Sequence, residues 1–171
     1  MDTKVNTKGA AAVLAGPGRA PNAAMRRVHV WAKAGLIPAD RVGDGEKAGW
    51  EFERQTIAIA AVLFELYDRG GVRSHGMLRA LFDKLASGEP ALIDRIIEDA
   101  REGTPVLVLT HWGTADGRAA TSFVVRLTSA LDEPNLAPGD EWEPLLEGVL
   151  SLAPLFDKLI ESSVVPFKAA R

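Results

Sequence analysis

The sequence predicts a mainly α-helical fold with short β hairpins, in which an N-terminal helical domain (residues 7–86) precedes a small α+β module (residues 89–171). The first observation behind this prediction is the spacing of apolar residues over 54–69 and 75–86, which repeats with the period of an amphipathic helix. The second is the glycine-rich stretch 40–49, which interrupts the helices and predicts a hairpin turn. Together they place a small hairpin between helices.

Two short helices are expected before this hairpin. The first covers Lys8–Ala15, with Thr7 as its N-cap, and the second covers Ala23–Ala34, with Asn22 as its N-cap. The segment Gly35–Pro38 is expected to end the second helix, because glycine readily takes the left-handed conformation that follows a helix C-terminus. The proline prevents the helix from continuing, so the chain turns sharply there.

The second of these helices is expected to bury one face and expose another. Val28 and Trp31 fall at core spacing. Other residues of the helix lie largely away from that face: Arg26, Arg27, Val30 and Lys33. A helix, a corner and a hairpin in this order suit a winged helix-turn-helix, whose second helix enters the major groove of DNA. Arginines on such a helix can bond guanine bidentately or grip phosphate.

The second half of the chain predicts a mixture of helix and strand. An amphipathic helix is expected over Pro90–Arg101, and strands are expected over Thr104–Trp112 and Thr121–Thr128, where β-branched and apolar residues dominate. Gly113–Gly117 has the composition of a turn between these strands. The last region, Glu141–Val164, is expected to be helical, with its prolines breaking or kinking the helix.

Charge is distributed unevenly between the two halves. The net charge is −3, but residues 1–86 hold 13 Lys/Arg and 9 Asp/Glu, whereas residues 87–171 hold 7 Lys/Arg and 14 Asp/Glu. A basic first half joined to an acidic second half fits a nucleic-acid-binding domain followed by an interaction module. The chain has no cysteine, which excludes disulfides, thiolate metal sites and cysteine nucleophiles.

Motifs for catalysis and for metal binding are absent from the sequence. The three histidines, His29, His75 and His111, lack the close spacing of metal ligands, and neither a Gly-x-Ser-x-Gly nor a His-Glu-x-x-His motif occurs. We therefore expect that the protein is not an enzyme and that it binds no cofactor and no metal. No apolar run approaches the roughly 20 residues that a membrane-spanning helix needs, so we expect no membrane association.

Residues 7–86 carry a recognisable series of features. A short Ala-rich helix comes first, a helix containing Trp31 runs into the segment Gly35–Pro38, and a Gly-containing hairpin closes with Trp50-Glu51-Phe52. A long helix, Gly70-Gly71-Val72 and a final helix follow. In order and spacing this half resembles the DNA-binding domain of MerR-type regulators, which implies a winged helix-turn-helix and DNA binding. The hairpin departs from the family pattern because Trp50 and Glu51 stand where two basic residues are usual and Glu53 follows Phe52. Carboxylates there oppose binding to phosphate.

The expected function is sequence-specific binding of double-stranded DNA, as a MerR-like transcriptional regulator in the cytoplasm. Helix 23–34 would read the major groove and wing 40–52 would contact phosphates. The residues expected to bind DNA are Arg26, Arg27, His29, Val30, Lys33, Arg41, Lys47 and Arg54. The second half is expected to form a homodimer or bind a partner, and the sequence names no small-molecule effector. Two alternatives stay open: a protein-interaction or adaptor module on the same fold, and a phage-type DNA packaging or recombination accessory factor.

Overall fold

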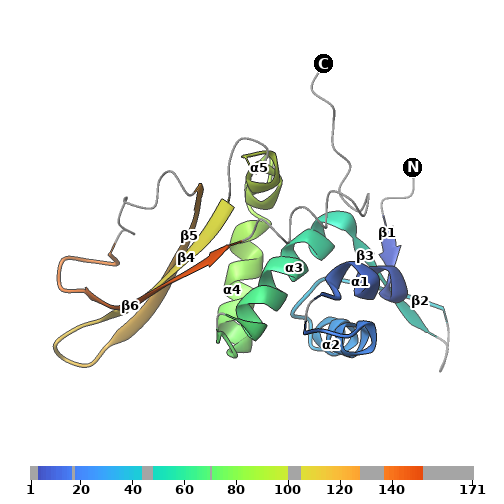
Figure 1. The fold of residues 1–171 in the computed structure, drawn as a ribbon, viewed down its shortest axis with the longest axis horizontal. Coiled ribbons are helices and arrows are strands. Elements are labelled where there is room, and N and C mark those ends of the chain that lie inside the picture. Colours follow the sequence, from blue (N-terminus) through green and yellow to red (C-terminus); the bar gives the residue numbers. More distant parts are fainter. Residues whose placement is uncertain are drawn as a thin grey trace, which may run out of the picture. The chain divides into compact units, whose positions relative to one another are not determined.

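The chain divides into two units, which are described separately. The computed structural model describes residues 4–16, 18–43, 48–69, 71–99, 105–127 and 137–151. The first unit, called the helical unit, comprises Met1–Asp94 and Asp157–Arg171, and the second, called the sheet unit, comprises Arg95–Phe156 (Figure 1). Helix α5 (Leu92–Asp99) crosses the boundary between them.

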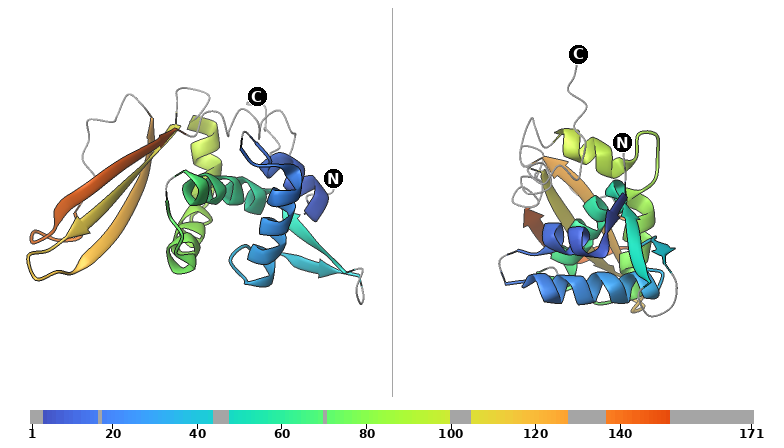
Figure 2. Two further views of the ribbon diagram at one scale, coloured as in Figure 1. Left: turned by 60° about the horizontal axis from the view of Figure 1, so that its bottom comes forward. Right: turned by 90° about the vertical axis from the view of Figure 1, so that its right-hand side faces the viewer.

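The helical unit combines helices with a small sheet. Its elements are β1 (Lys4–Asn6), α1 (Thr7–Leu14), α2 (Pro21–Lys33), β2 (Asp40–Val42), β3 (Gly49–Glu53), α3 (Arg54–Asp68) and α4 (His75–Leu85). Helices α1 and α2 lie side by side, and the hairpin of β2 and β3 extends away from the helices (Figure 2). The three strands form one antiparallel sheet in the order β1-β3-β2.

Helix α3 forms the centre of this unit. Ten of its side chains are buried, including Ile57, Leu63 and Phe64, and they lie around most of the circumference of the helix. A helix that is apolar around most of its circumference must be covered on all those faces, and α3 contacts α1, α4 and β3. Trp31 of α2 meets the ring of Phe64 edge to face, with ring centroids 4.6 Å apart. Helix α2 is therefore packed against the core through an aromatic contact.

The starts of α1 and α2 differ from the sequence prediction. The N-cap of α1 is Asn6 and not Thr7, and the Asn6 side chain accepts a hydrogen bond from the backbone N–H of Gly9 at 2.9 Å. Helix α2 begins at Pro21 with no side-chain cap, so the prediction of an Asn22 cap is wrong. Proline is well suited to the first helical position, because its fixed φ is helical and its missing N–H would have no partner there.

The corner after α2 is confirmed. Gly35 has a φ of 68°, its N–H donates to the carbonyl of Ala32, and the N–H of Leu36 donates to the carbonyl of Trp31. These two bonds form a Schellman motif, which satisfies carbonyls that the helix end would leave free. Leu36 and Ile37 then turn back into the core. The exposed face of α2 is thus fixed relative to the rest of the unit at its C-terminal end.

The sheet unit is built around one long central strand. Strands β4 (Pro105–Gly113) and β5 (Ala119–Leu127) form the predicted hairpin, and β6 (Glu143–Ser151) pairs with the other edge of β4. The sheet is antiparallel in the order β5-β4-β6. Pairing with β6 slips between His111 and Trp112, which is a β-bulge.

The prediction of a mainly α-helical chain is wrong. Three nine-residue strands make an antiparallel sheet in the second half, so the chain is a mixed α and β protein. The helix predicted over Glu141–Val164 is also wrong for Glu143–Ser151, and residues 152–164 lie outside the described residues. Gly148 disfavours a helix there, and the edge of β4 opposite β5 offers eight residues, Val106–Gly113, as partners for a strand instead.

None of the helices within the described ranges combines the length and the apolarity that crossing a membrane requires.

Candidate nucleic-acid interface

Helix α2 separates its side chains into a buried and an exposed face. Ala24, Val28 and Trp31 are buried against the core. Successive residues of a helix are rotated by about 100°, so the residues opposite the buried side share one surface. Four of the predicted DNA-binding residues lie there and are exposed: Arg26, His29, Val30 and Lys33. The helix contains no Asp or Glu, so no carboxylate of its own neutralises the positive charge of this face.

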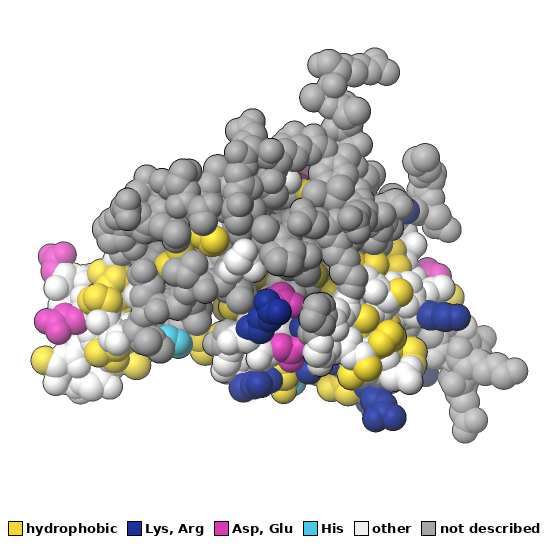
Figure 3. All heavy atoms as spheres, viewed as in Figure 1, with side chains coloured by type: hydrophobic (Ala, Val, Ile, Leu, Met, Phe, Trp, Pro, Cys, Tyr) yellow, Lys and Arg dark blue, Asp and Glu magenta, His cyan; other side chains and the backbone are white. Residues whose placement is uncertain are grey.

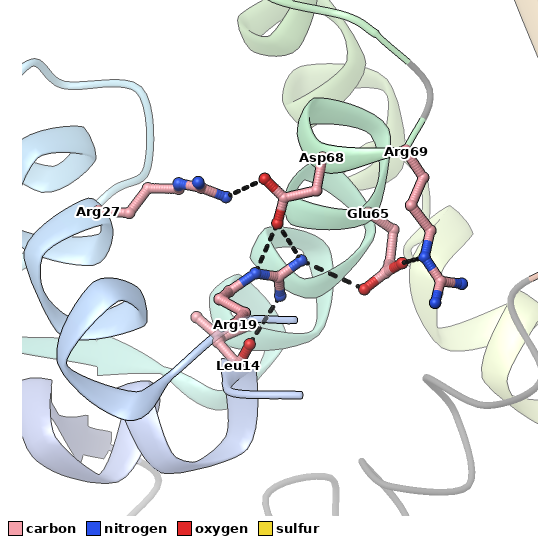
Figure 4. Close-up of polar contacts among 6 residues, drawn as sticks. All are labelled: Leu14, Arg19, Arg27, Glu65, Asp68 and Arg69. Carbon is pink, nitrogen blue, oxygen red and sulfur yellow. Dashed lines mark hydrogen bonds and ion pairs between the residues drawn. The ribbon is translucent and has the colours of Figure 1, made fainter. Parts of the chain in front are cut away.

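Arg27 lies on the other side of the helix, despite its place in sequence beside Arg26. Its Nη1 atom is 2.7 Å from Oδ1 of Asp68 on α3 (Figure 4). Its guanidinium lies over the ring of Tyr67, 4.6 Å from the centroid. The guanidinium is also 5.0 Å from the ring centroid of Phe64. These contacts direct the side chain of Arg27 toward α3, away from the exposed face of α2.

A second arginine, which the sequence reasoning missed, completes this contact between helices. The side chain of Arg19 is only 9% exposed. It donates hydrogen bonds to Asp68 and to the carbonyl of Leu14, each at 2.7 Å, and it pairs with Glu65 at 3.3 Å (Figure 4). Its partners on α3 are more than 45 residues away in sequence. No local pattern could have identified it, because Arg19 lies in a turn between two helices.

The pKa of Asp68 reflects two opposing effects. Burial is the largest single effect and raises the pKa, but hydrogen bonds and charges from Arg27 and Arg19 together outweigh it, so the pKa of Asp68 is lowered. The carboxylate is therefore ionised and holds both arginines. We call Arg19, Arg27, Glu65 and Asp68 the interhelical cluster. Its role is to hold α2 and the turn before α2 against α3.

The hairpin places Arg41 and the carboxylates on opposite faces. Arg41 is directly paired with Trp50, so the two side chains share one face of the sheet. Trp50 makes an edge-to-face contact with His29, with ring centroids 6.3 Å apart, so this face lies on the side of α2. Glu51 and Glu53 alternate with Trp50 along β3 and project from the other face.

Lys4 neutralises part of that second face. Its ammonium is 2.6 Å from a carboxylate oxygen of Asp40 and 3.9 Å from one of Glu53. The hydrogen bond with Asp40, followed by the charge of that carboxylate, raises the pKa of Lys4. Glu51 and Glu53, the carboxylates expected to oppose phosphate binding, are thus directed away from Arg41, and Glu53 is partly neutralised by Lys4.

Two predicted residues remain. Arg54 is the first residue of α3, and it is half-buried, whereas the four predicted residues on the exposed face of α2 are exposed. Lys47 lies outside the described residues.

The predicted site residues that come together are the four on the exposed face of α2, with Arg41 on the neighbouring hairpin. Arg26, Lys33 and Arg41 form no ion pair or side-chain hydrogen bond with any other described residue. On the face drawn in Figure 3, the Lys and Arg side chains of the helical unit do not form one continuous area, because apolar, uncharged and acidic side chains lie among them. The surface therefore offers separate cations rather than one dense basic patch.

In the part of the chain that the structure describes, no group of three or more His, Asp or Glu residues could hold a metal ion.

No protein-family model matches the chain, and no curated protein matches its sequence at a significant level. The likeness to MerR-type regulators therefore rests on the residues and their order alone.

Proposed function

We propose that this protein is a sequence-specific DNA-binding protein, a MerR-like transcriptional regulator that inserts the exposed face of α2 into the major groove. The observation that carries the proposal is the exposed face itself. It presents Arg26 and Lys33 without ion pairs among the described residues, on a helix free of carboxylates. Phosphates of DNA supply the negative charge that such a face lacks, and much of the affinity of DNA-binding proteins comes from neutralising them.

Within this proposal the residues divide by role. Arg26 would contact a base edge, because an exposed arginine on a groove-facing helix can bond guanine through O6 and N7. Lys33 and Arg41 would contact phosphates on either side. His29 would lie near the bases, supported by its contact with Trp50. Arg27 would act indirectly by holding α2 in place through Asp68.

The spread of cations implies modest dependence on salt. Two phosphate contacts from Lys33 and Arg41 would give a slope of log affinity against log salt of about −2 for one copy of the chain. Two copies bound together would double the slope. We propose such a homodimer, because readers of this kind bind two half-sites about one helical turn apart. The protein would act in the cytoplasm, where its DNA lies.

The experiment is selection of bound sequences from random duplex DNA at two salt concentrations, followed by binding measurements on the enriched sequence. The expected result is a shared sequence whose affinity falls at the higher salt. Arg26→Ala should weaken binding, whereas Arg95→Ala, which removes an exposed arginine from α5, should leave it unchanged. Binding with no enriched sequence would favour a packaging or recombination factor. No binding at low salt would favour a protein-interaction module.

A further inference from the structure

Val30 is the most exposed large apolar side chain among the described residues of the helical unit. It is 55% exposed, compared with 39% for Met25 and 45% for Val42. Of its neighbours on the helix surface, Ala34 is too small to cover it, and the side chain of Arg27 is turned toward Asp68 on α3. The branched side chain therefore stands clear of its surroundings on the same exposed side of α2 as Arg26 and Lys33.

The spacing of Val30 from Arg26 suits neighbouring base pairs. The two residues are one helical turn apart, about 6 Å along the axis of the helix. Stacked base pairs are separated by about 3.4 Å. A helix that lies along the major groove with Arg26 on one base would therefore bring Val30 within about two base pairs of that position.

The chemistry of the major groove offers one apolar group to such a side chain. Thymine presents a C5-methyl group there, and apolar side chains contact it in preference to the polar edges of the other bases. A protein partner is less well matched, because Val30 is surrounded by Arg26, Lys33 and His29 rather than by further large apolar side chains. Positive charge around a single exposed valine fits a polyanion that carries an isolated methyl group.

We propose that Val30 recognises the C5-methyl group of a pyrimidine that lies within about two base pairs of the base contacted by Arg26. The inference rests on the proposed DNA-binding function and adds one element of its specificity. Thymine and 5-methylcytosine carry the same methyl group at the same place in the groove, so either could be the source. The bound sequence would then contain a methylated pyrimidine at one fixed distance from a guanine.

The test uses the full chain and the duplex enriched by selection. Each thymine is replaced in turn by deoxyuridine, which removes the methyl group and leaves the hydrogen-bonding edge unchanged. At one position the affinity of the wild-type protein should fall about fourfold, the effect of losing one buried methyl group. In Val30→Ala the same replacement should have no effect, whereas Val42→Ala, which alters an exposed valine on the hairpin, should retain it. Alanine is a better helix former than valine, so the variant should fold.

A second arm identifies the source of the methyl group. The same base pair is changed to one containing cytosine or 5-methylcytosine, and the two affinities are compared. A preference for 5-methylcytosine that disappears in Val30→Ala would extend recognition to any C5-methylated pyrimidine, and its absence would restrict recognition to thymine. If the protein binds its sequence but no deoxyuridine replacement matters, or if the effect persists in Val30→Ala, the inference fails and the proposed function stands. If no duplex is bound, the proposed function itself fails.

Discussion

The two sides of helix α2 place arginines of adjacent sequence number in opposite surroundings. Arg27 lies against α3, paired with Asp68 and stacked over Tyr67, whereas Arg26 is exposed and has no ion pair among the described residues. The difference arises from the 100° turn between successive helical residues. One arginine stabilises the fold, and the other is available to a partner. This division is the basis of the proposed function and can be tested from both sides.

Removal of the shared carboxylate of the interhelical cluster should have the largest effect on stability. Asp68→Ala leaves Arg19, whose side chain is 9% exposed, without its closest acceptor and also removes the partner of Arg27. The free energy of unfolding should fall by about 2 kcal/mol, since an incompletely paired buried charge is costly but Glu65 and the carbonyl of Leu14 remain. Urea denaturation of the wild type and of Asp68→Ala measures this difference in the free energy of unfolding.

A matched control removes an exposed carboxylate from an ion pair within one helix. Asp83→Ala breaks the pair with Arg79 on α4, where both side chains are largely exposed. The expected loss is at most about 0.5 kcal/mol. Equal losses in the two variants would show that the interhelical cluster stabilises no more than a surface pair.

Acid should weaken the same cluster. The pKa of Asp68 is lower in the folded protein than its ordinary value of 3.8, so folding favours the ionised form. This contribution is fully present above the ordinary pKa and is lost as the pH falls through the lower, folded pKa. Denaturation from pH 6 down to the acid range should show a decline that is smaller in Asp68→Asn. An identical pH dependence in both proteins would contradict the assignment.

Truncation of Arg27 should affect stability more than truncation of Arg26. Arg27→Ala removes an ion pair and a ring contact and should lower the free energy of unfolding by about 1 kcal/mol. Arg26→Ala removes an exposed side chain, so its effect should stay within about 0.5 kcal/mol. Thermal and urea denaturation of the two variants measure this difference. A lower stability of Arg26→Ala than of Arg27→Ala would contradict the prediction.

The smallest expected effects concern the phosphate contacts. Lys33→Ala and Arg41→Ala should each weaken binding to every duplex by a similar factor and reduce the salt slope by about 0.9. Arg95→Ala serves as the control with an unchanged slope. If either variant altered the preferred sequence instead, that side chain would be reading a base rather than a phosphate.

Local patterns were sufficient to predict the helices and the corner of the helical unit. Apolar spacing predicted α3 and α4, and Gly35 takes the expected left-handed conformation. These features depend on residues a few positions apart. The burial of Arg27 does not, because its partner Asp68 lies 41 residues away, and spacing on the helix alone gave no reason to separate it from Arg26.

The sheet unit was harder to predict for a related reason. The β4–β5 hairpin followed from β-branched residues on either side of a turn, and it is confirmed. Strand β6 was predicted as part of a helix over Glu141–Val164. Its strand conformation is determined by β4, 30 to 45 residues earlier in the chain, which supplies the backbone partners. Pairing between distant segments decided what propensity left ambiguous.

The most direct test of the account compares Arg26→Ala with Arg27→Ala for binding to the selected duplex. Fluorescence anisotropy at one salt concentration, at a temperature where circular dichroism shows both variants folded, gives their dissociation constants. The account predicts that Arg26→Ala binds at least about tenfold more weakly than the wild type, whereas Arg27→Ala stays within about threefold. Equal losses in the two variants, or a larger loss in Arg27→Ala, would contradict the division of α2 into a structural and a DNA-binding face.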